Sequence, residues 1–315
     1  MKKTFIFTLG MVYFLTACAG TSVSETLPVT TKSPLPPTET VTPHPTSRPT
    51  ETYTASPIPT ATEAWIFQGP GNVTVPIILY HRIDYSPINS RYYVTPEKFE
   101  EQIKLLHDWE YTSITTTMLI KAITEGATLP PRPILLTMDD GNLDNFTNAF
   151  PIMQKYGFTG VLYLVGNYIG AKDYMNTEQI LEMHDAGWEV GSHSMNHLDL
   201  TTLPPDALRY EIVESRKFLE QELGIPILTF AYPFGTRNDS ALDYVEFAGY
   251  IGAMGASGYT PAQGMWNLYY LQRAEIKGSE DAKTFTRFLP WSGNPSFLPT
   301  DTPTPSPTPS RTPNP

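Results

Sequence analysis

Two short motifs near the middle of the chain carry side chains that suit metal chemistry. Asp139 and Asp140 follow a run of apolar residues and precede Gly141, and His193 is separated from His197 by three residues. Adjacent carboxylates at a strand end point in different directions, so one can bind a cation while the other acts as a base. Two histidines at this spacing suit one metal ion held from a single helical turn. With a carboxylate they complete a three-ligand site that leaves positions open for water.

Each motif also has a simpler structural explanation. Asp-Gly is a common turn pair, so Asp140 and Gly141 could merely close a loop. A lone pair of histidines at this spacing is likewise a weak signal of metal binding. A shared site is favoured because each motif directly follows a predicted strand, and Ser194 and Asn196 could then orient the two histidines.

Two further polar groups stand at the same kind of position. His81 follows the apolar run 75–80, and Tyr232-Pro233 follows the apolar run 227–231. The C-terminal ends of parallel strands share one rim of an α/β barrel. We therefore expect residues that are far apart in the sequence to meet in one pocket at that rim.

The elements that must position these residues alternate between short β-type runs and amphipathic helical patterns. The predicted strands cover 75–80, 111–114, 133–138, 160–165, 188–191, 227–231, 250–253 and 273–276. One predicted helix begins at Pro96. The other predicted helices cover 118–124, 145–156, 177–185, 204–223, a stretch that ends near Gly249, and 279–288. Such alternation predicts parallel strands with helical crossovers. A closed or nearly closed barrel is favoured over an open, doubly wound sheet, because no glycine-rich dinucleotide loop follows the first strand.

At this point a family resemblance becomes visible. The segment 137–141, Thr-Met-Asp-Asp-Gly, resembles the first motif of the NodB-homology polysaccharide deacetylases (carbohydrate esterase family 4), usually Thr-Phe-Asp-Asp-Gly. The segment 193–197 matches their second motif, His-Ser/Thr-x-x-His, and 230–235 is similar to their third. The resemblance spans about residues 76–288 and implies a distorted (β/α)7-type barrel.

The resemblance also implies a role for each motif. Asp139 would be the general base. The implied ligands of one divalent transition metal are Asp140, His193 and His197. Zinc is expected first, with cobalt, nickel or iron as alternatives. The metal would polarise the acetamide carbonyl and lower the pKa of a bound water, and the oxyanion is expected to rest on the metal and on the backbone N–H at Tyr232-Pro233.

The sequence departs from the family pattern at the residue that protonates the leaving amine. Most members supply this acid from a late Leu-x-His motif, but the corresponding segment 271–273 reads Leu-Gln-Arg. His81 is predicted to be the acid instead, as in the poly-β-1,6-N-acetylglucosamine deacetylase branch, whose motifs are circularly permuted. The alternative is a rim histidine that only bonds an aspartate or the backbone. His107 and His184 lie in predicted helices and are expected to be surface or packing residues.

A second departure concerns the arginine that usually tethers the base aspartate from the third motif. Ala231 and Tyr232 stand there instead. Arg273, in the last predicted strand, could orient Asp139 in its place. The family's fourth-motif tryptophan has no assignable match, although Trp266 lies close by in the sequence.

The N-terminus predicts export. Lys2 and Lys3 precede an apolar run that is too short for a spanning helix and ends at Cys18, the only cysteine of the chain. This pattern resembles a bacterial lipobox, so residues 1–18 are predicted to be a lipoprotein signal peptide with Cys18 lipidated. An ordinary cleaved signal peptide is the alternative. We expect an exported protein of the cell envelope, anchored by lipid to the outer face of the cytoplasmic membrane, or secreted.

Composition divides the rest of the chain into a domain and two extensions. Residues 19–64 and 299–315 are Thr/Ser/Pro-rich, with too few apolar side chains to fold, so they are expected to be a disordered linker and tail. Residues 65–298 are then the predicted polysaccharide deacetylase domain. The net charge of −11 argues against a nucleic-acid partner held by phosphate contacts.

The expected activity is removal of N-acetyl groups from an extracellular N-acetylglucosamine polysaccharide, which is an exopolysaccharide, peptidoglycan or a chitin-like polymer. One alternative is an esterase that removes O-acetyl groups from a glycan such as xylan. A catalytically silent glycan-binding module and a purely structural envelope protein are the others. The complete set of metal ligands beside a spare carboxylate argues against a silent module, because glycan binding alone does not require it.

Overall fold

The computed structural model describes residues 65–293 of the 315-residue chain. The predicted signal peptide, the linker and the tail lie outside these residues. None of the helices within 65–293 has the length and apolar character needed to cross a membrane.

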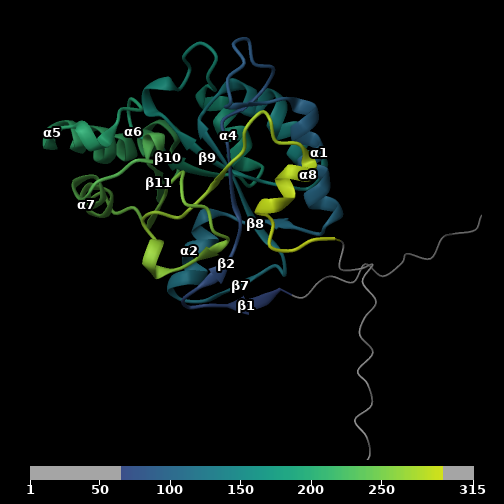
Figure 1. Cartoon of the computed structure of the whole chain (residues 1–315). Coiled ribbons are helices and arrows are strands. Elements are labelled where there is room, and N and C mark those ends of the chain that lie inside the picture. The colour runs from purple at the N-terminus through teal and green to yellow at the C-terminus, as the bar shows by residue number, and fades with distance from the viewer. Residues whose placement is uncertain (1–64, 294–315) are drawn as a thin grey trace, which may run out of the picture. The chain divides into compact units, whose positions relative to one another are not determined.

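Parallel strands form one curled sheet at the centre of the domain (Figure 1). Along the sheet the order is β12-β11-β10-β9-β8-β3-β14, and β6 also pairs with β8. The strands are β3 (Ile77–Tyr80), β6 (Thr112–Ser113), β8 (Pro133–Asp140), β9 (Val161–Leu164), β10 (Glu189–Ser192), β11 (Thr229–Ala231), β12 (Gly252–Met254) and β14 (Ala274–Glu275). All of these pairings are parallel.

The two ends of the sheet approach each other. A parallel bridge joins Met254, the last residue of β12, to Leu271, just before β14. The backbone N–H of Leu271 donates to the carbonyl of Ala253 at 2.8 Å, and the N–H of Gly255 donates to the carbonyl of Leu271 at 2.9 Å. The sheet is therefore a curled, incompletely closed barrel, which confirms the predicted fold class rather than a doubly wound open sheet.

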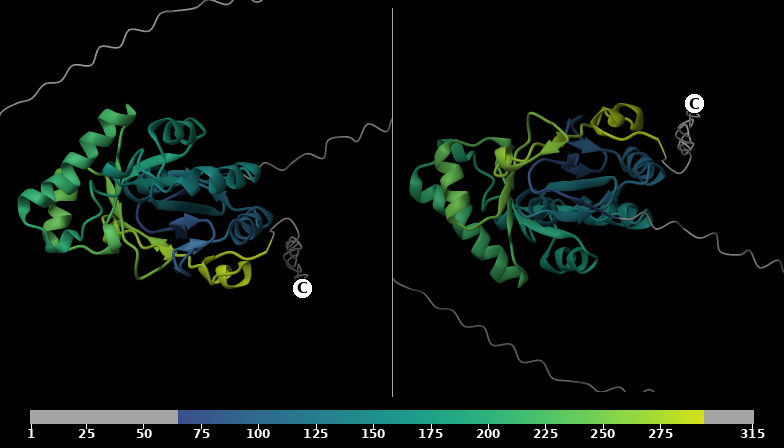
Figure 2. Two further views of the ribbon diagram at one scale, coloured as in Figure 1. Left: turned by 90° about the horizontal axis from the view of Figure 1, so that it is seen from above. Right: turned by 90° about the horizontal axis from the view of Figure 1, so that it is seen from below.

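Helices pack around the outside of the strands (Figures 1 and 2). They are α1 (Pro96–Asp108), α2 (Thr116–Thr124), α3 (Phe150–Lys155), α4 (Thr177–Asp185), α5 (Pro205–Arg209), α6 (Ser215–Leu223), α7 (Asp239–Phe247) and α8 (Ala282–Phe285). Two helices that the sequence predicts as single units contain a wider, π-helical turn. These turns are η1 (Asn145–Ala149), which leads into α3, and η4 (Tyr210–Glu214), which joins α5 to α6.

Shorter strand pairs complete the domain. Strand β1 (Ile66–Gln68) pairs antiparallel with β7 (Ala127–Leu129), β2 (Val73–Thr74) pairs antiparallel with β13 (Ala262–Gln263), and β4 (Arg82–Ile83) pairs parallel with β5 (Tyr93–Val94). Because β7 leads into the start of β8, the β1–β7 pair lies near the N-terminal end of the barrel. The β4–β5 pair follows β3 and lies at the C-terminal end.

Side chains alternate between the inside and the outside of the barrel, as the strand period of two requires. On β8, Leu135 packs in one core cluster, with Ile77 of β3 and Tyr163 of β9, whereas Leu136 packs in a second cluster that includes the buried face of α1. Thr137 and Asp139 share the face of Leu135. The strand therefore aims Asp139 at the barrel interior and sends Asp140 to the other side.

Candidate active site

The four groups singled out in the sequence meet at the C-terminal rim of the barrel. A pocket of about 420 Å³ opens there. Its lining includes His81, Asp139, Asp140, His193, His197 and Tyr232. His107 and His184 lie elsewhere, as expected. His107 is exposed on α1, and the Nδ1 of His184 contacts the carbonyl of Trp188 at 3.1 Å.

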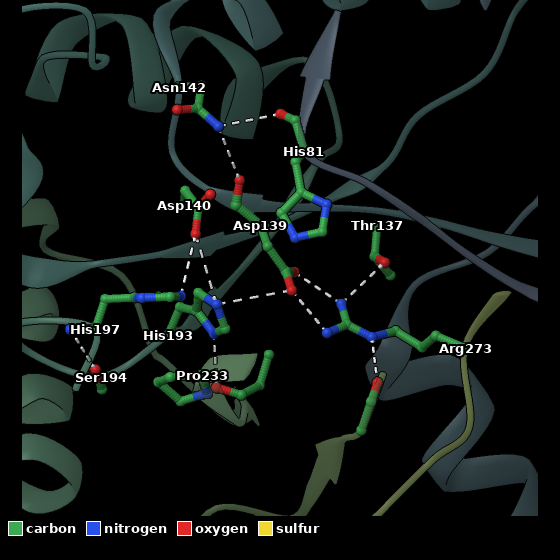
Figure 3. A network of polar contacts seen from close by, with 12 residues as sticks. His81, Thr137, Asp139, Asp140, Asn142, His193, Ser194, His197, Pro233 and Arg273 are labelled. Carbon is green, nitrogen blue, oxygen red and sulfur yellow. Dashed lines mark hydrogen bonds and ion pairs between the residues drawn. The ribbon is translucent and has the colours of Figure 1, made fainter. Parts of the chain in front are cut away.

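Three of these side chains form a group that could hold a metal ion. The Nε2 of His193 lies 3.7 Å from Oδ1 of Asp140, and the Nε2 of His197 lies 3.5 Å from the same oxygen (Figure 3). Two ligand atoms that each lie about 2.1 Å from one tetrahedral ion are about 3.4 Å apart. Oδ1 of Asp140 is buried and has no hydrogen-bond partner among the described residues. The spacing and this unsatisfied oxygen both fit a cation.

His193 is held in the orientation that a ligand needs. Its Nδ1 donates to the backbone carbonyl of Ala231 at 2.7 Å, which leaves Nε2 as the atom that faces Asp140. Burial lowers the pKa of His193 below the ordinary histidine value, although the nearby charges of Asp139 and Asp140 oppose this. The imidazole is therefore neutral at pH 7, and a neutral imidazole is the form that binds metals.

The loop that carries the two histidines is not the helical turn that the spacing suggested. Residues 193–197 are irregular, and Ser194 and His197 have φ angles of 69° and 58°. The N–H of His197 donates to Oγ of Ser194 at 2.9 Å, which closes the loop locally. The prediction of a helical turn was wrong because a tight loop with left-handed residues brings the same two positions together.

The turn explanation of Asp140-Gly141 is correct for the backbone, and it leaves the Asp140 side chain free to face the two histidines. Asp140 has a φ of 77° and Gly141 a φ of 80°, so the chain turns sharply as it leaves β8. A positive φ is strained for a residue other than glycine, and such strain is typical of functional sites. The turn carries the Asp140 carboxylate toward the two histidines instead of along the strand direction.

Asp139 forms a two-pronged ion pair with Arg273. The two terminal nitrogens of Arg273 donate to the two carboxylate oxygens of Asp139, each at 2.7 Å, and both side chains are buried (Figure 3). Burial alone would raise the pKa of Asp139, but the charge of Arg273 and the hydrogen bonds that it donates outweigh burial, and the pKa is lowered to about 2. Arg273 thus makes the contact for which the sequence had suggested it.

His81 lies beside Asp139, on a different side from the ligand group (Figure 3). Its ring packs 4.8 Å from the ring of Tyr92, and its Nδ1 is buried with no hydrogen-bond partner among residues 65–293. The backbone carbonyl of His81 accepts hydrogen bonds from the side-chain amides of Asn142 at 3.1 Å and Asn145 at 2.9 Å. The backbone at His81 is thus anchored, while this ring nitrogen remains available.

The backbone N–H of Tyr232 is not available for an oxyanion. It donates to the carbonyl of Met254 at 3.1 Å, because the pairing of β11 with β12 continues one residue beyond β11. Pro233 has no N–H to offer, so the oxyanion contact predicted for Tyr232-Pro233 was wrong. Tyr232 lines the pocket, and its hydroxyl is buried without a partner in the described part of the chain.

Two aromatic rings flank the ligand group and His81. Phe234 has a φ of 58°, is 62% exposed, and places its ring 4.6 Å from that of His197. Tyr92 occupies the corresponding place beside His81. Trp266 is exposed and lines a separate pocket with Arg237 and Glu246, so it is not the aromatic neighbour of His81.

Three residues that hold the site were not identified from the sequence. Asn142 directly follows the Asp-Asp-Gly motif and Asn145 lies three residues later, and both side-chain amides donate to the carbonyl of His81. Glu211 bonds the loop between the two histidines. It falls on the buried stripe of the predicted helix 204–223, and a charged residue on such a stripe was the signal that could have identified it.

Substitutions at Asp139 and Arg273 test whether the two buried charges stabilise the fold as a pair. Arg273→Met leaves a buried carboxylate without its partner, and we expect it to lower the free energy of unfolding by about 3–5 kcal/mol. The double variant Arg273→Met/Asp139→Asn removes both charges and should recover most of that loss. Urea unfolding of the metal-free protein measures both values. Equal stability of the single and double variants would contradict the coupling.

Comparisons with known proteins agree with this geometry. Residues 126–253 match the family model described as polysaccharide deacetylase. The chain is 29% identical, over 293 residues, to YxkH of Bacillus subtilis strain 168, whose name places it among the polysaccharide deacetylases; the match covers 92% of this chain and 99% of that protein. It is 27% identical, over 209 residues, to a poly-β-1,6-N-acetyl-D-glucosamine N-deacetylase of Staphylococcus aureus strain MRSA252, covering 61% of this chain and 69% of that one.

The fold has a solved counterpart. The deacetylase PplD of Streptococcus pyogenes superposes with a TM-score of 0.65 and 24% identity, covering 69% of this chain and 98% of that one. This likeness concerns the arrangement of the strands and helices. The family model and the motifs at the barrel rim lead to one conclusion: residues 126–253 match the polysaccharide deacetylases, a family of hydrolases, and the motifs around them are similar to those of the NodB-homology class (carbohydrate esterase family 4).

Proposed function

We propose that this chain removes N-acetyl groups from an extracellular N-acetylglucosamine polysaccharide in a metal-dependent reaction. The observation that carries the proposal is the ligand group Asp140, His193 and His197 beside an ionised, buried Asp139. A glycan-binding module has no need of this combination. A divalent ion bound by the three ligands would polarise the acetyl carbonyl and lower the pKa of water.

Asp139 is suited to accept the proton of the attacking water. The fork of Arg273 keeps the carboxylate ionised and fixes its plane, so its lone pairs have a constant direction. Oδ2 of Asp139 lies 3.8 Å from Nε2 of His193, which places the base next to the ligand group. A water bound to a metal in the ligand group would therefore lie next to this base.

His81 is suited to protonate the leaving amine. An amide anion is too poor a leaving group to depart without a proton, so this reaction needs an acid in addition to the base. His81 lines the same pocket as Asp139 but is not part of the ligand group. Its anchored backbone and packed ring hold it in place across the pocket from His197.

Two observations support an N-acetylated substrate. One Staphylococcus aureus relative is named for N-deacetylation of a β-1,6-linked N-acetylglucosamine polymer. The pocket also contains His81 as a candidate acid outside the ligand group. An amide needs such an acid more than an ester does, because an alkoxide leaves more readily than an amide anion. The O-acetyl esterase is therefore the second candidate, and acetylated xylan is the substrate that tests it.

The activity test uses the full chain, prepared metal-free and reloaded with Zn²⁺, Co²⁺ or Ni²⁺. Acetate release is measured from β-1,6- and β-1,4-linked N-acetylglucosamine oligomers and from acetylated xylan. We expect metal-dependent release from an N-acetylated oligomer. Asp140→Ala should abolish both release and stoichiometric metal binding, because it removes the only carboxylate of the ligand group.

Asp185→Asn, at the exposed end of α4, is the matched control and should behave as the wild type. Acetate release from acetylated xylan alone would contradict the N-deacetylase and favour the O-acetyl esterase. Binding of one metal ion with no release from any substrate would contradict a hydrolase and favour the silent module.

A second test concerns the acid. His81→Ala should lower kcat on the N-acetylated oligomer by roughly 10²–10⁴-fold and leave the affinity for Zn²⁺ unchanged, because His81 is not a ligand. His107→Ala, on the surface of α1, is the control and should leave kcat unchanged. An equal decrease of kcat and metal affinity in His81→Ala would instead assign the residue to the metal site.

We also propose that the chain is exported and attached to the outer face of the cytoplasmic membrane through Cys18. The support is the lipobox-like sequence that ends at Cys18. An extracellular polymer as substrate requires such a location.

This location has its own test. In a bacterial host fed with labelled palmitate, we expect label in the wild-type chain and sedimentation with the membranes. Cys18→Ser should lose the label and the membrane association. A wild-type chain that is secreted without label would show that the signal is an ordinary cleaved one.

A further inference from the structure

Glu211 lies behind the loop that carries both histidine ligands. It belongs to the π-helical turn η4, and its side chain is 1% exposed. Oε2 accepts the backbone N–H of Met195 at 3.1 Å and that of Asn196 at 2.8 Å, and Oε1 accepts the side-chain amide of Asn196 at 2.6 Å. All three donors come from the residues between His193 and His197.

Four other backbone groups of this loop have hydrogen-bond partners of their own. The N–H of His193 donates to Leu164, and that of His197 donates to Ser194. The carbonyls of Ser194 and Met195 accept from Gly166 and Asn167, respectively. The N–H of Met195 is shared between the carboxylate of Glu211 and the backbone carbonyl of the same residue, each at 3.1 Å. The N–H of Asn196 and its side-chain amide contact Glu211 through the carboxylate alone. Without the carboxylate, the part-buried N–H of Asn196 would lose its hydrogen-bond partner.

The charge of Glu211 is unusual in its surroundings. Among residues 65–293 it takes part in no ion pair, although its carboxylate is buried. The carboxylate is stabilised by hydrogen bonds instead. Successive backbone N–H groups can point at one anion where a loop contains a left-handed residue, and Ser194 is such a residue. A buried negative charge without a cation of its own also favours a bound cation nearby. The loop that it holds carries two of the three candidate metal ligands.

We propose that Glu211 is the positioning residue of the metal site: its carboxylate sets the conformation of the loop and thereby the separation of His193 and His197. This inference rests on the proposed metal site and adds to it a residue that does not touch the ion. Asn196 transmits the contact through its side chain, and Asn167 supports Asn196 from the other side with a hydrogen bond of 2.6 Å.

The test measures metal affinity, not activity. Full-length wild type, Glu211→Gln and Asn196→Ala are titrated with Zn²⁺ against a chromophoric chelator, and the visible spectrum of the Co²⁺ form is recorded. Residues behind the ligands typically contribute about 10–100-fold in metal affinity. We therefore expect Glu211→Gln to weaken Zn²⁺ binding by about that factor and to alter the Co²⁺ spectrum. Asn196→Ala retains the carboxylate and its two backbone contacts, so its loss should be smaller.

Glu189→Gln is the matched control. Glu189 lies at the opposite end of β10, the strand that leads to His193. Its carboxylate also accepts a backbone N–H, that of Thr117 at 2.9 Å, and a side-chain donor, the hydroxyl of Thr229 at 3.1 Å. Its substitution should lower the melting temperature of the metal-free protein without changing Zn²⁺ affinity or the Co²⁺ spectrum.

The outcomes separate the two proposals. A wild-type chain that binds neither ion overturns the metal site and this inference together. Wild-type binding with unchanged affinity and spectrum in Glu211→Gln overturns only the role of Glu211. Equal loss of affinity in Glu211→Gln and Glu189→Gln would also overturn it, because the effect would then follow from general destabilisation. If Glu211→Gln does not fold, an unchanged Zn²⁺ affinity in Asn196→Ala rejects the proposal, and a several-fold loss supports it.

Discussion

The buried ion pair of Asp139 and Arg273 is the interaction on which the site and the closure of the barrel both depend. Arg273 precedes β14, and its Nε donates to the carbonyl of Gly255, just after β12, at 2.6 Å. Its two terminal nitrogens reach Asp139 at the end of β8. One side chain therefore connects three strand ends across the barrel interior, where neither charge could be buried alone. The same bonds keep the base ionised, so the requirement of folding and that of catalysis coincide.

The orientation of the candidate metal ligands depends on loops, whereas that of Asp139 does not. The direction of Asp139 follows from the alternation of side chains along β8. Asp140 and His197 instead reach the pocket through backbone turns with φ angles of 77° and 58°. Conformations of this kind persist only where neighbouring contacts enforce them. The bond of His193 to Ala231 and the bonds of Glu211 to the histidine loop supply such contacts.

Sequence reasoning predicted most of the strands and helices because their patterns are local. The helix over 177–185 was predicted with the bounds that it has in the structure. The membership of the site was predictable too, since parallel strands end at one rim. The backbone path of 193–197 was not, because a helical turn and a tight loop can share the same histidine spacing. The amide of Tyr232 was also misassigned. This N–H is free only if the pairing of β11 with β12 ends before Tyr232. The residue types in the sequence do not indicate where that pairing ends.

The order of strands explains how this chain can lack both the late histidine and the third-motif arginine of the deacetylases that it resembles. In the sheet β3 lies between β14 and β8, so the segments next to these three strands all approach Asp139. Arg273 stands where the Leu-x-His pattern would place the acid, and it tethers the base instead. His81 directly follows β3, which pairs with both β8 and β14, and is the proposed acid. Its carbonyl accepts from Asn142 and Asn145, which lie shortly after Asp139 and Asp140. The proposed acid and base are thus joined by hydrogen bonds although they are 58 positions apart in the sequence. Adjacent strands bring such residues together at a barrel rim, whatever their order along the chain.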